Sequence, residues 1–333
     1  MRALITGASG FIGSSLIQEL NRLGFEVHAL MRSTSSPANL EGMRFERRSG
    51  DLSDFESLKR AVVGMDYVFH LAGMTAAPDR ETFMRCNAQG TGDLARAVAE
   101  AAPGLTRFVY VSSLAAGGPA RKKQPRREEE LPTPVSAYGE SKLAGELELL
   151  KYKDKFPVAI VRPPLVYGPK DKGVFVIIQT VARNLMPIPS GKGEGGHKYY
   201  SAVHVTDLCK GIVQVGLASA DKAPSGEIFY LCEDEFYTYQ DFLRTIADSL
   251  GNHPFRFKVP QALIYGAAAA LTGLGKVTKR SYPFNLDKFN EILPDYWICS
   301  NQKAKDVLGF LPEYPLAKGM KETVEWYKKN DWL

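Results

Sequence analysis

The chain has 333 residues, of which 44% are hydrophobic and 24% are charged, and its formal net charge is +5. This composition is typical of a globular protein and excludes a disordered chain. No stretch reaches the roughly 18 uninterrupted apolar residues of a membrane span, and the basic clusters lack the pattern of a nucleic-acid motif. We therefore expect no integral membrane segment and no nucleic-acid partner.

The four cysteines are far apart in the sequence and show neither a CxxC motif nor clustered histidines. We interpret Cys86, Cys209, Cys232 and Cys299 as free thiols of a reducing compartment, and we predict no metal site. Because the first residues already form a predicted strand, they leave no room for a signal peptide. We expect a cytoplasmic protein.

A strand, a glycine turn and a helix are predicted over the first twenty residues. Residues 3–6 are a short apolar run typical of a buried parallel strand, and residues 14–20 have helical spacing. Gly7 permits the turn, Gly10 lets a pyrophosphate approach the backbone, and Gly13 lets helix and strand pack closely. The free N–H groups of the helix would face the anion, which predicts a dinucleotide here. An ordinary glycine-rich turn is the alternative.

The next predicted strand, residues 26–30, leads to Arg32. In a dinucleotide-binding fold the residue at this position contacts the adenosine ribose. An acidic residue would pair with a free 2′-hydroxyl, whereas Arg32 followed by Ser33 and Thr34 suits a 2′-phosphate. We predict NADP(H). NAD(H) stays possible if Arg32 merely stacks on the adenine.

Small residues follow the next strands, which leaves space for a ligand across the sheet edge. His70 ends an apolar strand, and we interpret it as a packed core residue without a catalytic role. Asn87 opens the following helix and is expected to fix the neighbouring loop through bonds to its backbone. The residues expected to face the cofactor here are Asp51, Leu52, Leu71, Ala72 and Gly73.

Two neighbouring segments carry the candidate catalytic residues. A strand over residues 108–111 leads to Ser113, and Tyr138 and Lys142 lie one turn apart on a later predicted helix. At this spacing the ammonium should favour the phenolate and lower the pKa of Tyr138 from about 10 toward neutrality. A tyrosine that exchanges a proton, a serine that binds the same oxygen and a lysine that holds the ribose suffice for hydride transfer to a carbonyl.

Position selects Tyr138, because the same spacing recurs at Tyr314 and Lys318, far from the cofactor strands and with a proline between them. The charged segment 120–130 separates Ser113 from Tyr138. We expect it to be a loop at the mouth of the site, with its charges solvated.

Together these motifs resemble the extended short-chain dehydrogenase/reductases, the NAD(P)-dependent epimerase/dehydratase superfamily. The resemblance runs nearly end to end and includes 7–13, 51–52, 70–73, 111–113, 138–142, 162–169 and 204–207. It implies an α/β protein with a doubly wound parallel sheet, the Rossmann fold, and a smaller α/β carboxyl-terminal substrate lobe. It also implies a homodimer with a four-helix interface and catalysis by Ser113, Tyr138 and Lys142.

The implied NAD(P)-binding domain is 1–167, which also receives part of about 203–232. The implied substrate lobe consists of 168–202 and 233–333. The expected cofactor-binding residues are Gly7, Ser9, Gly10, Phe11, Ile12, Gly13, Arg32, Asp51, Leu52, Leu71, Ala72, Gly73, Tyr138, Lys142, Pro163, Leu165 and Val166.

Positions at which this sequence departs from the family pattern reduce the number of reactions that we expect. Leu114 follows Ser113 where sugar-nucleotide dehydratases carry an acidic pair, so we do not expect dehydration. Sugar-nucleotide epimerases usually place an asparagine at Leu165 and an arginine at Tyr200, and losing such diphosphate contacts costs about 1.5–3 kcal/mol each. Lys198 or Arg183 could compensate, so an epimerase stays an alternative.

The strand 27–32 and the run 162–164 resemble the dihydroflavonol-reductase and 3β-hydroxysteroid-dehydrogenase branches, which act on bulky, uncharged alcohols and ketones. The helix of small apolar residues predicted over 259–275 could line an apolar substrate pocket or contact a membrane surface. An ordinary packing helix of the substrate lobe is an equally good interpretation. We predict an NADP(H)-preferring oxidoreductase of a secondary alcohol or ketone, sterol-like, flavonol-like or similar. The alternatives are a sugar-nucleotide epimerase with the same three residues and a non-catalytic NADP(H)-binding regulator.

Overall fold

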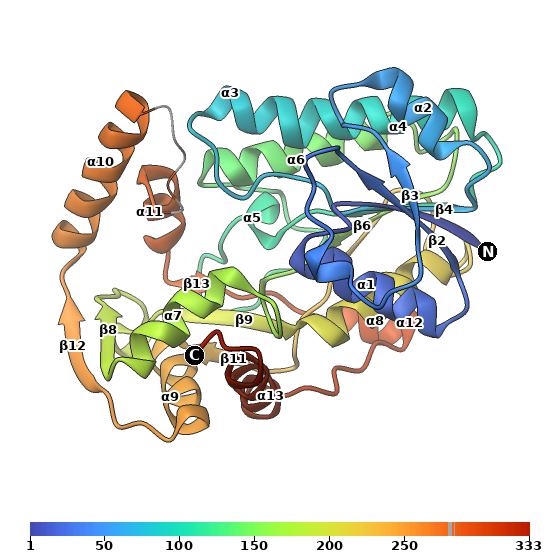
Figure 1. The fold of residues 1–333 in the computed structure, drawn as a ribbon. Coiled ribbons are helices and arrows are strands. Elements are labelled where there is room, and N and C mark those ends of the chain that lie inside the picture. The colour runs from blue at the N-terminus through green and yellow to red at the C-terminus, as the bar shows by residue number, and fades with distance from the viewer. Residues whose placement is uncertain (279–281, 283) are drawn as a thin grey trace.

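The computed structural model describes residues 1–278, 282 and 284–333 (Figure 1). Its central feature is a seven-stranded sheet in the order β10-β6-β5-β4-β1-β2-β3. Every neighbouring pair is parallel, which confirms the predicted Rossmann-type sheet. The strands are β1 (Arg2–Thr6), β2 (Glu26–Met31), β3 (Glu46–Ser49), β4 (Tyr67–His70), β5 (Arg107–Val111), β6 (Val158–Arg162) and β10 (Glu227–Tyr230).

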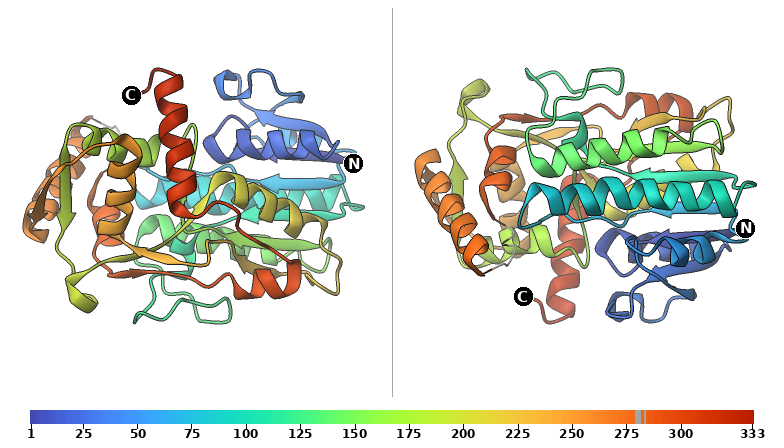
Figure 2. Two further views of the ribbon diagram at one scale, coloured as in Figure 1. Left: turned by 90° about the horizontal axis from the view of Figure 1, so that it is seen from below. Right: turned by 90° about the horizontal axis from the view of Figure 1, so that it is seen from above.

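Helices cover both faces of this sheet because its strands alternate their apolar side chains between two cores. Ala3 and Ile5 of β1 belong to the core beneath α1 (Phe11–Arg22) and α8 (Val205–Leu217). Leu4 belongs to the core beneath α2 (Phe55–Val62), α4 (Gly90–Ala101) and α6 (Ala137–Leu150). Seen from above, α4 and α6 lie side by side across one face (Figure 2).

The remaining strands form two smaller sheets. β9 (Tyr199–His204) pairs with β7 (Leu165–Tyr167), β11 (Phe236–Thr238) and β13 (Tyr296–Trp297), and β8 (Leu185–Pro189) pairs with β12 (Phe255–Val259). A third core beside them includes Tyr167, Ile178, Phe242, Met320 and Tyr327. The other helices are α3 (Arg80–Phe83), α5 (Leu114–Gly117), α7 (Lys172–Ala182), α9 (Tyr239–Leu250), α10 (Gln261–Thr278), α11 (Leu286–Ile292), α12 (Gln302–Leu308) and α13 (Leu316–Lys329), with a π-helical turn at Met84–Gln89 and 3-10 turns at Ala38–Leu40 and Glu194–Gly196.

A search of the described residues for membrane spans finds no helix that is both long enough and apolar enough to cross a bilayer.

Candidate active site

The turn between β1 and α1 is built around its glycines. Gly7 has a φ of +70°, and a Cβ there would lie 2.8 Å from the backbone nitrogen of Ala72. A Cβ on Gly13 would lie 2.1 Å from the carbonyl oxygen of Gly7. Gly10 precedes α1, and no side chain in the described part of the chain caps that helix end. The turn therefore fits an anionic group held by backbone N–H donors, as a dinucleotide pyrophosphate requires.

Neighbouring segments support this turn. The carbonyl oxygen of Ser9 accepts a 2.9 Å hydrogen bond from Asn39, and the carbonyl oxygen of Ile12 lies 3.7 Å from the thiol of Cys209. The Nζ of Lys170 donates to the carbonyl oxygen of Asn39 at 3.0 Å. Lys170 thereby links the segment after β7 to the glycine turn.

Two arginines lie together near the end of β2: Arg32 directly follows that strand, and Arg47 belongs to the neighbouring strand β3. Arg32 is exposed, and Nη2 of Arg47 donates to its carbonyl oxygen at 2.7 Å. Asp51 is engaged locally, because the N–H and hydroxyl of Ser53 donate to its carboxylate at 2.9 and 2.7 Å and lower its pKa. We did not identify Arg47 from the sequence; the parallel register of β2 and β3 brings it here.

His70 is a packed core residue, as predicted. Its ring nitrogens lie 2.6 and 2.9 Å from the hydroxyls of Thr6 and Thr91, and burial lowers its pKa to about 3. The prediction for Asn87 is also confirmed, because its side chain bonds both backbone polar groups of Met74 at 2.7 and 2.9 Å. Asn87 thus fixes the loop that contains the predicted cofactor residues Leu71, Ala72 and Gly73.

The three candidate catalytic residues come together at the carboxyl end of β5. Ser113 begins α5, and its hydroxyl accepts from the N–H of Ala115 at 3.1 Å. Tyr138 is the second residue of α6, and burial raises its pKa to about 12 while the neighbouring Ser113 hydroxyl opposes the rise. Lys142 is buried, and its Nζ donates to the carbonyl oxygen of Val111 at 2.8 Å.

The predicted lowering of the Tyr138 pKa is wrong for this structure. Lys142 directs its nitrogen toward the carbonyl oxygen of Val111 and lies 4.3 Å from the ring centre of Tyr110. Burial lowers the pKa of Lys142 itself to about 7, which weakens its effect as a cation. The shared helix face placed the two residues correctly but did not determine where the nitrogen points.

A buried ion pair lies beneath these residues. Glu146 is one turn after Lys142 on α6, and its oxygens lie 2.8 and 2.5 Å from two nitrogens of Arg162. The hydroxyl of Ser112 donates to the same carboxylate at 2.5 Å. The pair holds α6 against β5 and β6. The four-residue spacing from Lys142 was a sequence signal for it that we did not use.

Helix α11 meets the amino end of α6. Asp287 accepts from the N–H groups of Ala137 and Tyr138 at 2.6 and 3.3 Å, and Glu291 accepts from the hydroxyl of Ser136 at 2.8 Å. The negative charge of Glu291 helps to raise the pKa of Tyr138. A segment 150 residues later in the chain therefore stabilises the start of the helix that carries the candidate residues Tyr138 and Lys142.

One side of Tyr138 borders a cluster of mostly apolar and aromatic side chains. Tyr138 and Tyr200 pack against its buried members, which are Leu114, Ala115, Tyr230, Cys232, Trp297 and Cys299. Lys198, which we considered as a diphosphate contact, is buried and donates to the carbonyl oxygen of Ile292 at 2.8 Å and to Asp295 at 3.1 Å. Its nitrogen is engaged in structural contacts.

The remaining predicted cofactor residues lie around this edge. The carbonyl oxygen of Pro163 accepts from the N–H of Leu114 at 2.8 Å, which brings it beside Ser113. Leu165 and Val166 form β7 and are partly exposed. Leu52 lies against the start of α4 at Gly90.

The expectation of solvated charges in the segment 120–130 is wrong at two positions. Arg126 is buried, its N–H donates to the carbonyl oxygen of Ile298 at 3.0 Å, and its guanidinium donates to the carbonyl oxygens of Pro119 and Leu131. Glu128 accepts from the N–H of Tyr230 at 2.9 Å, and burial raises its pKa. The segment is anchored because these two charges satisfy neighbouring backbone groups.

One group of possible metal ligands occurs among the described residues. Donor atoms of Glu26, His28 and Glu46 lie within 4.8 Å of one another. Arg48 is also here, with its Nε 3.3 Å from Nδ1 of His28 and 3.1 Å from Glu46. Arg48 therefore supplies a counter-charge to Glu46 within this group.

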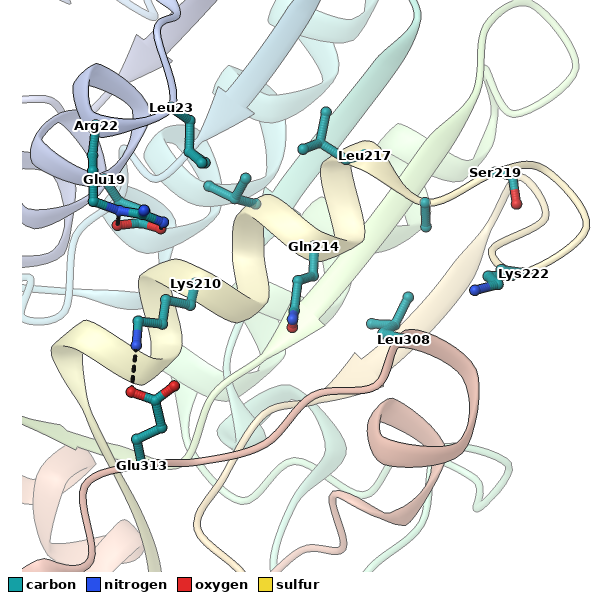
Figure 3. Close-up of a pocket in the computed structure, with 12 residues that line it drawn as sticks. Glu19, Arg22, Leu23, Lys210, Gln214, Leu217, Ser219, Lys222, Leu308 and Glu313 are labelled. Atoms are coloured by element: carbon teal, nitrogen blue, oxygen red, sulfur yellow. Dashed lines mark hydrogen bonds and ion pairs between the residues drawn. The ribbon is translucent and has the colours of Figure 1, made fainter.

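An open groove of about 630 Å³ lies away from the candidate catalytic residues, along α1 and α8 (Figure 3). Lys210 and Glu313 pair across it at 2.7 Å, and Arg22 pairs with Glu19 at 2.7 Å. The charges of this groove mainly satisfy one another.

Comparisons place the chain among known proteins. The model of the NAD dependent epimerase/dehydratase family matches residues 3–232. Ceramide reductase of Caulobacter vibrioides is 30% identical over 333 residues, with 99% of this chain and 95% of the relative covered. Sterol demethylase protein B of Methylococcus capsulatus is 26% identical, with 100% of both chains covered. The solved structure of UDP-glucuronic acid 4-epimerase from Bacillus cereus with UDP-glucuronic acid and NAD has a TM-score of 0.78 and 22% identity, with 99% of this chain and 100% of that chain covered.

Proposed function

The chain belongs to the NAD-dependent epimerase/dehydratase family of extended short-chain dehydrogenase/reductase enzymes, and from this premise we propose that it reduces bulky, uncharged ketones with NADPH. The observation that carries the proposal is the aromatic and apolar cluster against which Tyr138 packs. An apolar cluster beside Tyr138 favours the binding of uncharged substrates over that of a nucleotide diphosphate. The names of two relatives, a ceramide reductase and a sterol demethylase protein, support an apolar substrate.

The proposed chemistry assigns one task to each residue. A nicotinamide coenzyme, when bound, supplies the hydride. Tyr138 keeps its proton at neutral pH because its pKa is about 12, so it can donate that proton to the carbonyl oxygen of the substrate. The Ser113 hydroxyl hydrogen-bonds the same oxygen, and Lys142 holds the ribose of the coenzyme. A protonated tyrosine favours ketone reduction over alcohol oxidation at neutral pH.

The proposed preference for NADP(H) rests on Arg32 and Arg47. Both guanidinium groups are on exposed residues, and that of Arg47 donates to the Arg32 carbonyl oxygen; we propose that the two face the adenosine ribose. Two cations suit a 2′-phosphate through charge-assisted hydrogen bonds. The nearby carboxylate of Asp51 is engaged by Ser53, which reduces its competition for the arginines.

The sugar-nucleotide epimerase is the weaker candidate. Lys198, one of the two residues that could replace the missing diphosphate contact, donates instead to carbonyl groups and to Asp295. The other, Arg183, follows α7 and is exposed. Tyr200 stands at the usual arginine position and packs in the apolar cluster. A diphosphate here would lack charged partners, which disfavours its binding.

A thermal-stabilisation panel tests the proposal. The wild-type protein is melted with NADP(H), NAD(H), UDP-sugars, sterols and aromatic ketones, because a ligand that binds the folded state raises the melting temperature. We expect the largest rise with NADPH and a further rise with an apolar ketone or sterol. A rise with a UDP-sugar alone would favour the epimerase. Coenzyme binding without turnover of any ketone, alcohol or sugar would favour the non-catalytic regulator.

We also propose a homodimer formed through the α4 and α6 face. Leu147 of α6 is 56% exposed and offers an apolar contact for a second copy. Light scattering should give twice the chain mass, and Leu147→Glu should give the monomer. The cytoplasmic location stays a prediction.

A further inference from the structure

The first turn of α6 is capped from outside the helix. The N–H groups of Ala137, Tyr138 and Gly139 come too early in the helix to bond within it. The hydroxyl of Ser136 accepts from the N–H of Gly139 at 3.0 Å, as an ordinary helix cap does. The other two N–H groups donate to the carboxylate of Asp287, at 2.6 and 3.3 Å. Asp287 of α11 thus completes a cap that the local sequence leaves open.

A second carboxylate of α11 reaches the same helix end. Glu291 lies one turn after Asp287, so the two side chains share a face of α11. Oε1 of Glu291 accepts from the hydroxyl of Ser136 at 2.8 Å, and Oε2 accepts from the ammonium of Lys288 at 2.6 Å. The Glu291 side chain is 11% exposed and that of Lys288 is 51% exposed. The two acidic residues bring negative charge to the amino end of α6, where the helix dipole favours it.

Helix α11 comes later in the chain than every strand of the seven-stranded sheet, and it lies between α10 and the amino end of α6 (Figure 1). The N–H of Leu286 donates to the hydroxyl of Thr272 on α10 at 2.9 Å. At the other end of α11, Nε1 of Trp297 donates to the carbonyl oxygen of Glu291 at 2.6 Å. Trp297 belongs to the apolar cluster against which Tyr138 packs. The segment that borders the proposed ketone site is therefore bonded to the start of α6.

We propose that Asp287 and Glu291 are positioning residues for Tyr138, which hold its phenol in place for proton transfer to the substrate. The inference rests on the proposed function, in which Tyr138 is the proton donor. Asp287 acts through the backbone of α6, and Glu291 acts through Ser136. Because Tyr138 is the second residue of α6, a shift of the first turn moves its phenol relative to the Ser113 hydroxyl. A displacement of about 1 Å can reduce turnover by about 100-fold.

Glu291 also acts on the proton of Tyr138. Burial and the charge of Glu291 raise the pKa of Tyr138 to about 12. Glu291→Gln removes that charge alone and should lower this pKa. The other ionisable side chains that border Tyr138 or its contacts stay unchanged in this variant; they are Glu140 and Lys142 of α6, Arg80 of α3, Tyr110 of β5, Asp287 and Lys288 of α11, and the tyrosines and cysteines of the apolar cluster.

Two variants of matched size test the proposal kinetically. Asn at position 287 has one acceptor oxygen for two N–H groups, so Asp287→Asn should lower the turnover of ketone reduction by at least about tenfold. NADPH affinity, measured by calorimetry, should stay at the wild-type value. Glu291→Gln still accepts from the Ser136 hydroxyl. Its rate of alcohol oxidation should rise by at least about threefold at each pH between roughly 8 and 10, because a lower pKa leaves more Tyr138 as phenolate.

Each variant has a control of the same chemistry. Asp171 accepts from the N–H groups of Gly173 and Val174 at 2.7 and 2.9 Å at the start of α7, so Asp171→Asn removes an equivalent cap and should leave turnover unchanged. Glu140→Gln removes a charge of α6 that is 44% exposed and screened by water, and the pH dependence should not move. Equal losses of turnover in Asp287→Asn and Asp171→Asn would overturn the proposal. So would a Glu291→Gln oxidation profile identical to that of the wild type.

Amide hydrogen exchange needs no turnover, so the two proposals fail separately. Asp287→Asn should speed exchange at the start of α6 by at least about tenfold and leave the start of α7 at the wild-type rate. That result, together with a wild type that reduces no ketone, would refute the proposed function and leave the anchoring of α6 by Asp287 standing. Unchanged exchange in a variant that reduces ketones normally would refute the positioning role alone.

Discussion

Replacing Glu146 by glutamine tests the buried ion pair beneath α6, the helix that carries the candidate catalytic residues Tyr138 and Lys142. The side chains of Glu146 and Arg162 are each 2% exposed, and their closest nitrogen–oxygen distance is 2.5 Å. Glutamine would leave the Arg162 charge buried without a counter-charge, and breaking one partner of such a pair costs about 3–5 kcal/mol. Urea unfolding should show a lower midpoint with an unchanged slope.

A second acidic residue on the same helix supplies the control. Glu140 pairs with Arg80 at 2.7 Å, but these side chains are 44% and 64% exposed, so Glu140→Gln should cost less than about 1 kcal/mol. The double variant Glu146→Leu/Arg162→Met should recover much of the stability, because it leaves no unpaired charge. Equal costs for Glu146→Gln and Glu140→Gln would refute the reasoning.

Three further predictions concern the coenzyme and the proton. Gly13→Ala should lower the melting temperature and weaken NADPH binding, because the added Cβ would lie 2.1 Å from the Gly7 oxygen. Gly104→Ala is the control and should change neither quantity, since no described atom lies within 4 Å of a Cβ at that position. Arg32→Ala should weaken NADPH by at least about tenfold relative to NADH in calorimetry; an equal loss for both coenzymes would contradict the assignment. Because Tyr138 keeps its proton up to a pKa of about 12, ketone reduction rates should stay level between roughly pH 8 and 10, above the pKa of about 7 of Lys142, while alcohol oxidation rises; a reduction rate that falls across this range would argue for a lower pKa of Tyr138.

The fold could be predicted because its signals are local. The spacing of Gly7, Gly10 and Gly13 specifies a turn whose neighbours leave no room for a Cβ at Gly7 and Gly13. Each short apolar run supplies one buried strand, and parallel strands need a long crossover connection, which is usually a helix. The common location of Tyr138 and Lys142 could be predicted for the same reason, because one helix carries both.

The contacts that tune the site are long-range, and no local pattern predicts them. Asp287 bonds the N–H of Tyr138 across 149 positions of sequence. Arg126 and Glu128 look like solvated charges in the sequence, yet each satisfies backbone groups brought close only by folding. The Nζ of Lys142 donates to the carbonyl oxygen of Val111 and not to the phenol of Tyr138, because β5 ends beside Lys142. Side-chain direction and burial, and therefore pKa, depend on tertiary structure.

Steady-state oxidation of NADPH with an apolar ketone, measured for the wild type and for Tyr138→Phe, tests the central claim most directly. Phenylalanine keeps the ring that packs on the apolar cluster but removes the proton donor, so coenzyme affinity should hold while turnover falls by about 100-fold or more. The secondary alcohol should accumulate in step with NADPH loss in the wild type. Equal turnover by the two proteins, or wild-type turnover of a UDP-sugar and of no ketone, would contradict the account.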